Sequence, residues 1–170
     1  MTTIGKMTVT TPTDREMQVT RVFDAPRKLL FDAWTRPELL KGWLFGPDGW
    51  SLAVCEIDLR VGGAYRFVWR SPDKKDMGMG GVYREIAPPE RIVMTELFDV
   101  DWTGGETLAT IALTDQGGKT TLTQTVLYSS REARDGALGT GMEEGMAAAY
   151  DRLAELLPSM PAQASSRGAA

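Results

Sequence analysis

Hydrophobic residues alternate with polar ones through much of the middle of this chain, the pattern typical of β-strands. Residues 50–70 hold two such patterns joined by a glycine turn, Gly62-Gly63. In the second pattern Tyr65, Phe67 and Trp69 fall at every other position, so in a strand they share one face. Three large aromatic side chains on one face need something to pack against, which is either a helix or a ligand.

The same alternation predicts an antiparallel meander, because the segments are short and separated by turn residues. Strands are expected at residues 18–23, 50–58, 64–71, 79–86, 91–98, 106–114 and 120–128. One more strand is expected to begin near Met7, since residues 8–11 are all β-branched.

The period changes to three and four residues in two places, which predicts helices. A short helix is expected at residues 28–34, with Asp24 as its N-cap and Pro26 in its first turn, and a second at residues 37–43. After Ser130, an expected N-cap, residues 131–157 are helical in pattern, and Pro158 ends them. One apolar stripe on this last segment contains Met142, Met146, Ala149, Tyr150, Leu153, Leu156 and Leu157.

These elements predict an α+β fold in which a curved antiparallel sheet of about seven strands wraps around a long C-terminal helix. Two short helices follow the first strand. We expect a flexible N-terminus at residues 1–14, one domain at residues 15–157, and a disordered tail at residues 158–170.

Composition narrows the function. The net charge of −4 gives no electrostatic reason to bind nucleic acid or an anionic membrane. No apolar run approaches the roughly 20 residues of a membrane span, and the N-terminus lacks an apolar signal core, so a cytoplasmic protein is expected. The chain has 0 histidines, which removes Ser-His-Asp and Cys-His catalysis and His-ligated metals. Cys55 is expected to be a buried inert thiol, and no metal or cofactor motif is present.

Four sequence segments resemble one family. They are FDAPRKLLFDAWTRPELLKGWLFGPDGW (23–50), DLRVGGAYRF (58–67), GVYREIAPPERIVMTE (81–96) and LTDQGGKTTLTQT (113–125). They are similar to the helix-grip superfamily called START-like or SRPBCC, and most of all to bacterial homologues of the C-terminal domain of the heat-shock-protein-90 ATPase activator. The resemblance implies a cavity between sheet and helix, in which relatives bind lipids, sterols, polyketides or plant hormones. It also allows a homodimer.

Candidate ligand-binding residues are those that this fold would place around the cavity, although each could equally be ordinary core. The apolar candidates are Trp43, Phe45, Trp50, Tyr65, Phe67, Trp69, Met79, Met94, Met142, Met146 and Tyr150. The polar candidates are Arg84, Glu96 and Gln124. If Ile86 pairs with Ile92, then Arg84 pairs with Met94 and lies diagonal to Glu96. Arg84 and Glu96 would then form an ion pair, either buried on the concave face or exposed to solvent.

Three functions remain open. The first is binding of a small, mostly hydrophobic molecule. The second is a chaperone-associated interaction module, as the resemblance to the ATPase activator implies. The third is a cyclase or hydrolase acting on an apolar substrate, in which Arg84, Glu96 or Tyr65 would act as acid, base or electrostatic clamp. The lack of histidine and of a metal site favours a non-enzymatic role.

Overall fold

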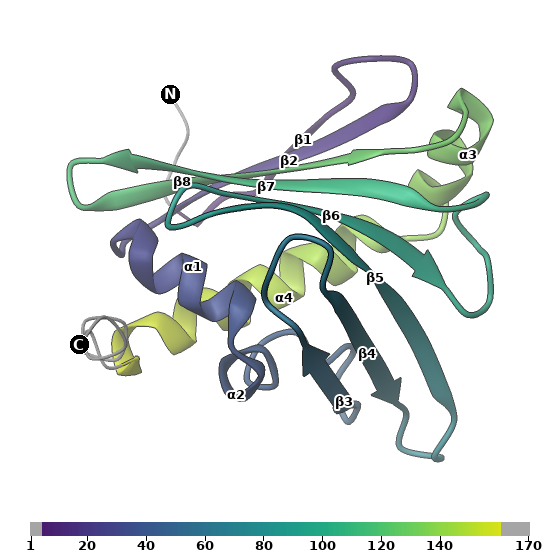
Figure 1. Ribbon diagram of the computed structural model, residues 1–170, viewed down its shortest axis with the longest axis horizontal. Helices are drawn as coiled ribbons and strands as arrows, with labels where there is room; N and C mark the ends of the chain where they lie inside the picture. Colours follow the sequence, from purple (N-terminus) through teal and green to yellow (C-terminus); the bar gives the residue numbers. More distant parts are fainter. Residues whose placement is uncertain (1–4, 161–170) are drawn as a thin grey trace.

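The computed structural model describes residues 5–160, which form one 8-stranded antiparallel sheet with its longest helix on the concave side (Figure 1). The strand order is β1-β2-β8-β7-β6-β5-β4-β3. The strands are β1 (Thr8–Thr10), β2 (Glu16–Phe23), β3 (Ser51–Ile57), β4 (Ala64–Arg70), β5 (Asp76–Ala87), β6 (Arg91–Phe98), β7 (Thr107–Gln116) and β8 (Lys119–Leu127).

The helices lie where the change of period predicts them. They are α1 (Arg27–Thr35), α2 (Pro37–Leu40), α3 (Arg131–Leu138) and α4 (Met142–Leu156), followed by the 3₁₀ turn η1 (Leu157–Ser159). In Figure 1 the sheet curves around α4, with α1 on the same side. The predicted α+β helix-grip architecture is therefore confirmed.

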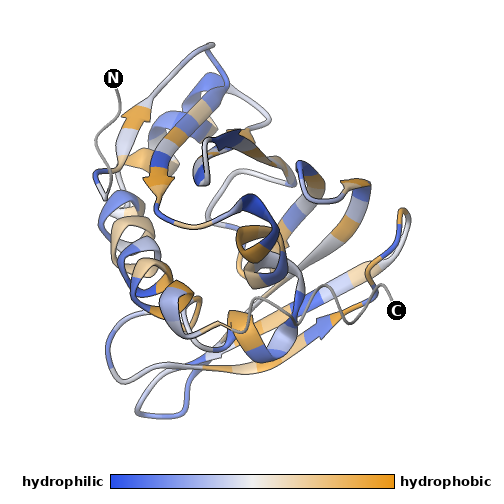
Figure 2. Ribbon diagram, turned by 90° about the vertical axis from the view of Figure 1, so that its left-hand side faces the viewer, coloured by the Kyte–Doolittle hydropathy of each residue, from blue (hydrophilic) through white to orange (hydrophobic). Residues whose placement is uncertain are grey.

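Alternation along the strands gives the sheet one apolar face. On β4 the side chains of Tyr65, Phe67 and Trp69 are buried, while Arg66 and Val68 between them are more exposed. Figure 2 shows the same mixture of hydrophobic and hydrophilic positions along the strands. The prediction that these three aromatic residues share a face is confirmed.

The two ends of the domain differ from the sequence prediction. The strand expected near Met7 is present as Thr8–Thr10, which pair with β2 as the eighth strand, so the domain begins before residue 15 and residues 8–10 are not a flexible terminus. Pro158 does not end the ordered chain, since η1 continues α4 and Met160 packs into the core at 8% exposure. The predictions for residues 1–4 and 161–170 lie outside the described residues.

Two predicted N-caps have different outcomes. Ser130 caps α3, its hydroxyl accepting a hydrogen bond from the Ala133 N–H at 3.0 Å, as predicted. Asp24 does not cap α1, because the helix begins later and Pro26 occupies the N-cap position without a side-chain hydrogen bond. Pro26 has extended backbone angles, and its ring fixes φ, so the helix begins only at Arg27.

A β-bulge changes the predicted pairing of β5 with β6. Ile86 pairs with Ile92 as expected, but the register shifts between Tyr83 and Glu85, so Tyr83 and not Arg84 pairs with Met94. The extra residue turns Arg84 to the solvent side, where it is exposed. The predicted Arg84–Glu96 pair is therefore wrong on both alternatives, since the two side chains lie on opposite faces of the sheet.

Candidate ligand cavity

A cavity of about 700 Å³ lies between the concave face of the sheet and α4. Its large apolar lining residues are Trp34, Trp43, Trp50, Phe67, Trp69, Met77, Met79, Met94, Phe98, Trp102, Met142 and Met146. The structure thus brings all the candidate residues to the cavity except Phe45, Tyr65 and Arg84.

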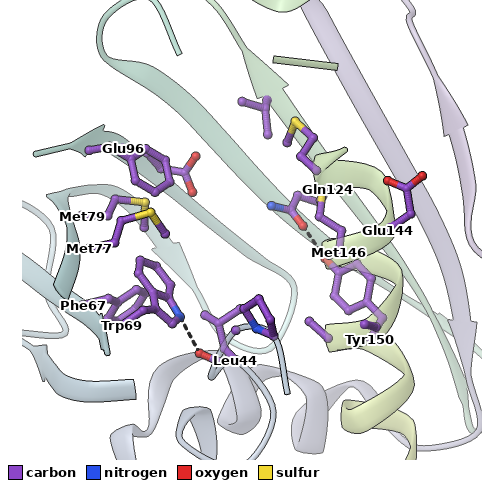
Figure 3. Close-up of a pocket in the computed structure, with 18 of the residues that line it drawn as sticks. Leu44, Phe67, Trp69, Met77, Met79, Glu96, Gln124, Glu144, Met146 and Tyr150 are labelled. Carbon is purple, nitrogen blue, oxygen red and sulfur yellow. Dashed lines mark hydrogen bonds between the residues drawn. The ribbon is translucent and has the colours of Figure 1, made fainter. Parts of the chain in front are cut away.

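The cavity has two facing walls (Figure 3). Phe67 and Trp69 on β4, with Met79 on β5, form one wall. Met146 and Tyr150 on α4 form part of the other, and they lie apart from the β4 rings in the close-up. The aromatic side chains of β4 and the apolar stripe of α4 therefore face each other across the cavity and do not pack directly together.

Tyr65 has a structural role outside the cavity lining. It pairs with Gly81 on β5, and its hydroxyl donates a hydrogen bond to the Thr95 carbonyl on β6 at 2.5 Å. The side chain therefore crosses one strand to reach the next. Tyr65 can reach Thr95 because Gly81 has no side chain. A Cβ at Gly81 would lie 1.9 Å from the Thr95 carbonyl oxygen.

Phe45 lies between two lining residues, Leu44 and Gly46, but its ring is turned toward α4. The Arg152 guanidinium sits over it, 4.2 Å from the ring centroid. Arg152 also pairs with Asp48, Nη2 to Oδ1 at 3.2 Å. Phe45 thus helps to hold α4 against the 44–49 loop, and the Trp69 indole fixes the same loop by donating to the Leu44 carbonyl at 2.9 Å.

Glu96 is a carboxyl group in the cavity wall, and its side chain points into the open space (Figure 3). It follows Met94 and precedes Phe98 at the same parity on β6. The Thr107 hydroxyl donates to its Oε1 at 3.2 Å. Burial raises the pKa of Glu96 to about 7, and the hydrogen bond from Thr107 opposes this only in part.

Gln124 and Tyr150 link the sheet to α4 on one side of the cavity (Figure 3). Gln124 is on β8 at the parity of Leu122 and Val126, and the Tyr150 hydroxyl donates to its Oε1. Tyr150 also stacks on Trp43, the ring centroids 6.0 Å apart. Gln124 is thereby positioned by the helix, and its amide is another polar group of the lining.

Several lining residues escaped the sequence prediction. Phe98 shares parity with Met94 and Glu96 on a predicted strand, so the alternation alone could have identified it. Met77 lies before the strand predicted at residues 79–86, because β5 begins earlier, at Asp76. Trp34 and Trp102 carry no such signal, because one is on α1 and the other in the loop after β6. Tyr128 was assigned to the end of the last strand but not to the cavity.

Other chemistry is limited within residues 5–160. No group of three or more His, Cys, Asp or Glu side chains is placed to hold a metal ion there. Cys55 is only partly buried, not buried as predicted, but desolvation still raises the pKa of its thiol to about 11, which agrees with an unreactive cysteine. In the same described part of the chain, none of the helices combines the length and apolarity needed to cross a membrane.

A curved antiparallel sheet around a long C-terminal helix, with a cavity between them, defines the helix-grip class of START-like proteins. Within that class, a family model described as "Activator of Hsp90 ATPase homolog 1-like protein" matches residues 24–158. The chain therefore belongs to this family.

Solved structures agree with this assignment. A Rhodobacter sphaeroides protein is 34% identical with a TM-score of 0.86, covering 91% of this chain and 100% of its own. A Nitrosomonas europaea protein is 26% identical with a TM-score of 0.77, covering 88% of this chain and 97% of its own. An Arthrobacter aurescens protein is 25% identical with a TM-score of 0.78, covering 91% and 92%. Among curated proteins, none matches significantly.

Proposed function

We propose that this protein binds a small, mostly hydrophobic molecule in the cavity between the sheet and α4. The observation that carries the proposal is the cavity itself, about 700 Å³ and walled by tryptophan, phenylalanine and methionine. Pockets for small molecules usually enclose about 300–1,000 Å³ and combine an apolar lining with a few polar groups. Methionine side chains adapt their shape to a bound molecule, which suits a site of this kind.

The test is a thermal-shift and native mass-spectrometry screen with fatty acids, sterols, flavonoids and polyketides. A bound molecule raises stability by RT ln(1 + [L]/Kd), about 2.7 kcal/mol at a hundredfold excess over Kd. The matched control is Met146→Trp, which places a large ring in the cavity and should abolish the shift. No shift with any class, or an equal shift in Met146→Trp, would contradict the proposal.

Family membership favours a second candidate, a module that acts on a chaperone. The family description names an Hsp90 ATPase activator, and the match spans almost the whole domain. The measurement is the ATPase rate of the Hsp90 from the same cell with and without this protein. A rise in rate that persists in Met146→Trp would support a chaperone role independent of the cavity, and an unchanged rate would count against it.

Glu96 favours a third candidate, catalysis on an apolar substrate. Of the three residues considered for acid–base work, it alone lines the cavity, and a pKa of about 7 suits proton transfer. Hydrolysis of apolar aryl esters, compared between the wild type and Glu96→Gln, is the direct assay. Equal rates in the two proteins would remove the catalytic role.

A further inference from the structure

The charges around the cavity are unevenly distributed. Its ionisable lining residues include the carboxylates of Asp48, Glu96 and Glu144. Within the described part of the chain, Arg152 is the cationic residue of the lining, and it is already paired with Asp48 and stacked on Phe45. The cavity therefore offers an acidic group without a neutralising cation, because no ion pair found among residues 5–160 includes Glu96.

Aromatic rings form part of the same cavity wall as Glu96. Phe98 lies two residues after Glu96 on β6, on the same face of the strand. Its ring centroid is 4.9 Å from that of Trp102 and 6.4 Å from that of Trp69. The faces of such rings carry negative potential and attract cations. A carboxylate beside a run of rings is thus an arrangement that favours a positively charged group.

We propose that the ligand of this cavity is an apolar amine, whose ammonium group pairs with Glu96 and lies against the rings of Phe98 and Trp102. The inference rests on the proposed binding function and specifies its ligand class. The apolar body of the amine would fill the space between Phe67, Met79 and Met146.

Other ligand charges fit less well. A carboxylate placed at the same depth would meet Glu96 with like charge, and Arg152 is held by its own partners. A neutral molecule would offer Glu96 no counter-charge and would gain no ion pair from it. An ammonium group satisfies the carboxylate and the rings together.

The pH dependence of binding follows from the groups that face Glu96. These are Thr107 on β7, Tyr65 on β4, Tyr128 after β8 and Tyr150 on α4. The pKa of Tyr128 is raised to about 12, and burial raises the pKa values of Tyr65 and Tyr150 as well. The more exposed carboxylates of Asp48 and Glu144 and the paired Arg152 complete the charged lining. Glu96 is thus the facing group that changes charge near neutral pH, so amine binding should strengthen as pH rises through 7.

The experiment uses three probes of one shape: anthracenylmethylamine, anthracenylmethanol and anthracenecarboxylate. Binding is followed by anthracene fluorescence at pH 8 with the wild type, Glu96→Gln and Phe98→Leu. The amine should bind wild type tightest and the carboxylate weakest. Glu96→Gln should weaken amine binding about tenfold or more and leave the alcohol within about twofold. Phe98→Leu should weaken the amine more than the alcohol.

The outcomes separate this inference from the function on which it rests. If the alcohol or the carboxylate binds as tightly as the amine, or if Glu96→Gln weakens the alcohol equally, the amine assignment is overturned and the binding function stands. If none of the three probes binds wild type, the amine assignment is overturned, and the binding function is decided separately by the ligand screen described above. Should either variant fail to fold, the wild type still decides, because amine affinity must rise between pH 5.5 and 8 while alcohol affinity stays constant.

Discussion

The hydroxyl of Tyr150 on α4 donates a hydrogen bond to Gln124 Oε1 on β8, joining the helix to the sheet on one side of the cavity. Both side chains are buried, at 2% and 8% exposure. A buried acceptor that loses its donor costs about 1–3 kcal/mol, whereas removing both partners costs much less.

We therefore expect Tyr150→Phe to lower the free energy of unfolding by about 1–2 kcal/mol. The double variant Tyr150→Phe/Gln124→Leu should recover much of that loss, because no polar group is then left unpaired. Urea unfolding of the wild type, the two single variants and the double variant gives the coupling energy directly. Additive losses would mean that the two groups do not interact.

The raised pKa of Glu96 predicts how stability depends on pH. The folded state holds the Glu96 proton up to about pH 7, while the unfolded chain loses it near 4.5. Stability should therefore fall as pH rises between these values, by an amount on the order of 3 kcal/mol. In Glu96→Gln the fall should be absent, so the variant gains on the wild type from pH 5 to pH 8. Asp76 and Asp99, whose pKa values their arginine partners lower, act at more acidic pH and cancel in the comparison.

Two glycines should respond oppositely to alanine. A Cβ on Gly81 would lie 1.9 Å from the Thr95 carbonyl oxygen, so the backbone of β5 must move. Gly81→Ala should cost about 3 kcal/mol or more. Gly145, inside α4, has open space at its Cβ position, and Gly145→Ala should stabilise by about 0.5–1 kcal/mol. Thermal unfolding compares them; equal effects would refute the difference in space.

Arg134 should be far more important for stability than its neighbour Arg131. Its Nη1 donates to the Thr13 carbonyl at 2.7 Å and the Glu16 carbonyl at 3.3 Å, which ties α3 to the start of β2. Arg134→Met leaves those acceptors without a donor and should cost about 1–3 kcal/mol. Arg131 is exposed, and its ion pair with Asp135 is long, Nε to Oδ2 at 3.9 Å. Arg131→Met should therefore change stability by about 0.5 kcal/mol or less. Denaturant titration of the two variants is the measurement.

The sequence was sufficient to predict the order of strands and helices, because period and turn residues are local properties. Parity along β4 and β6 also found Phe67, Trp69, Met94 and Glu96 correctly. It failed at Arg84, since the bulge inverts parity within β5 and depends on pairing with β6. It failed at Tyr65 as well, because burial on the concave face does not distinguish a cavity wall from a side chain that reaches over Gly81.

The bond from Tyr65 to Thr95 has an evolutionary consequence. The curved wall is braced within the sheet layer, by a residue that does not line the cavity. Apolar lining side chains that make no hydrogen bond, such as Phe67 and Met79, are therefore not needed to hold the strands together. They can be exchanged for others of similar bulk at little cost to folding, so ligand preference can diverge while the backbone stays nearly unchanged.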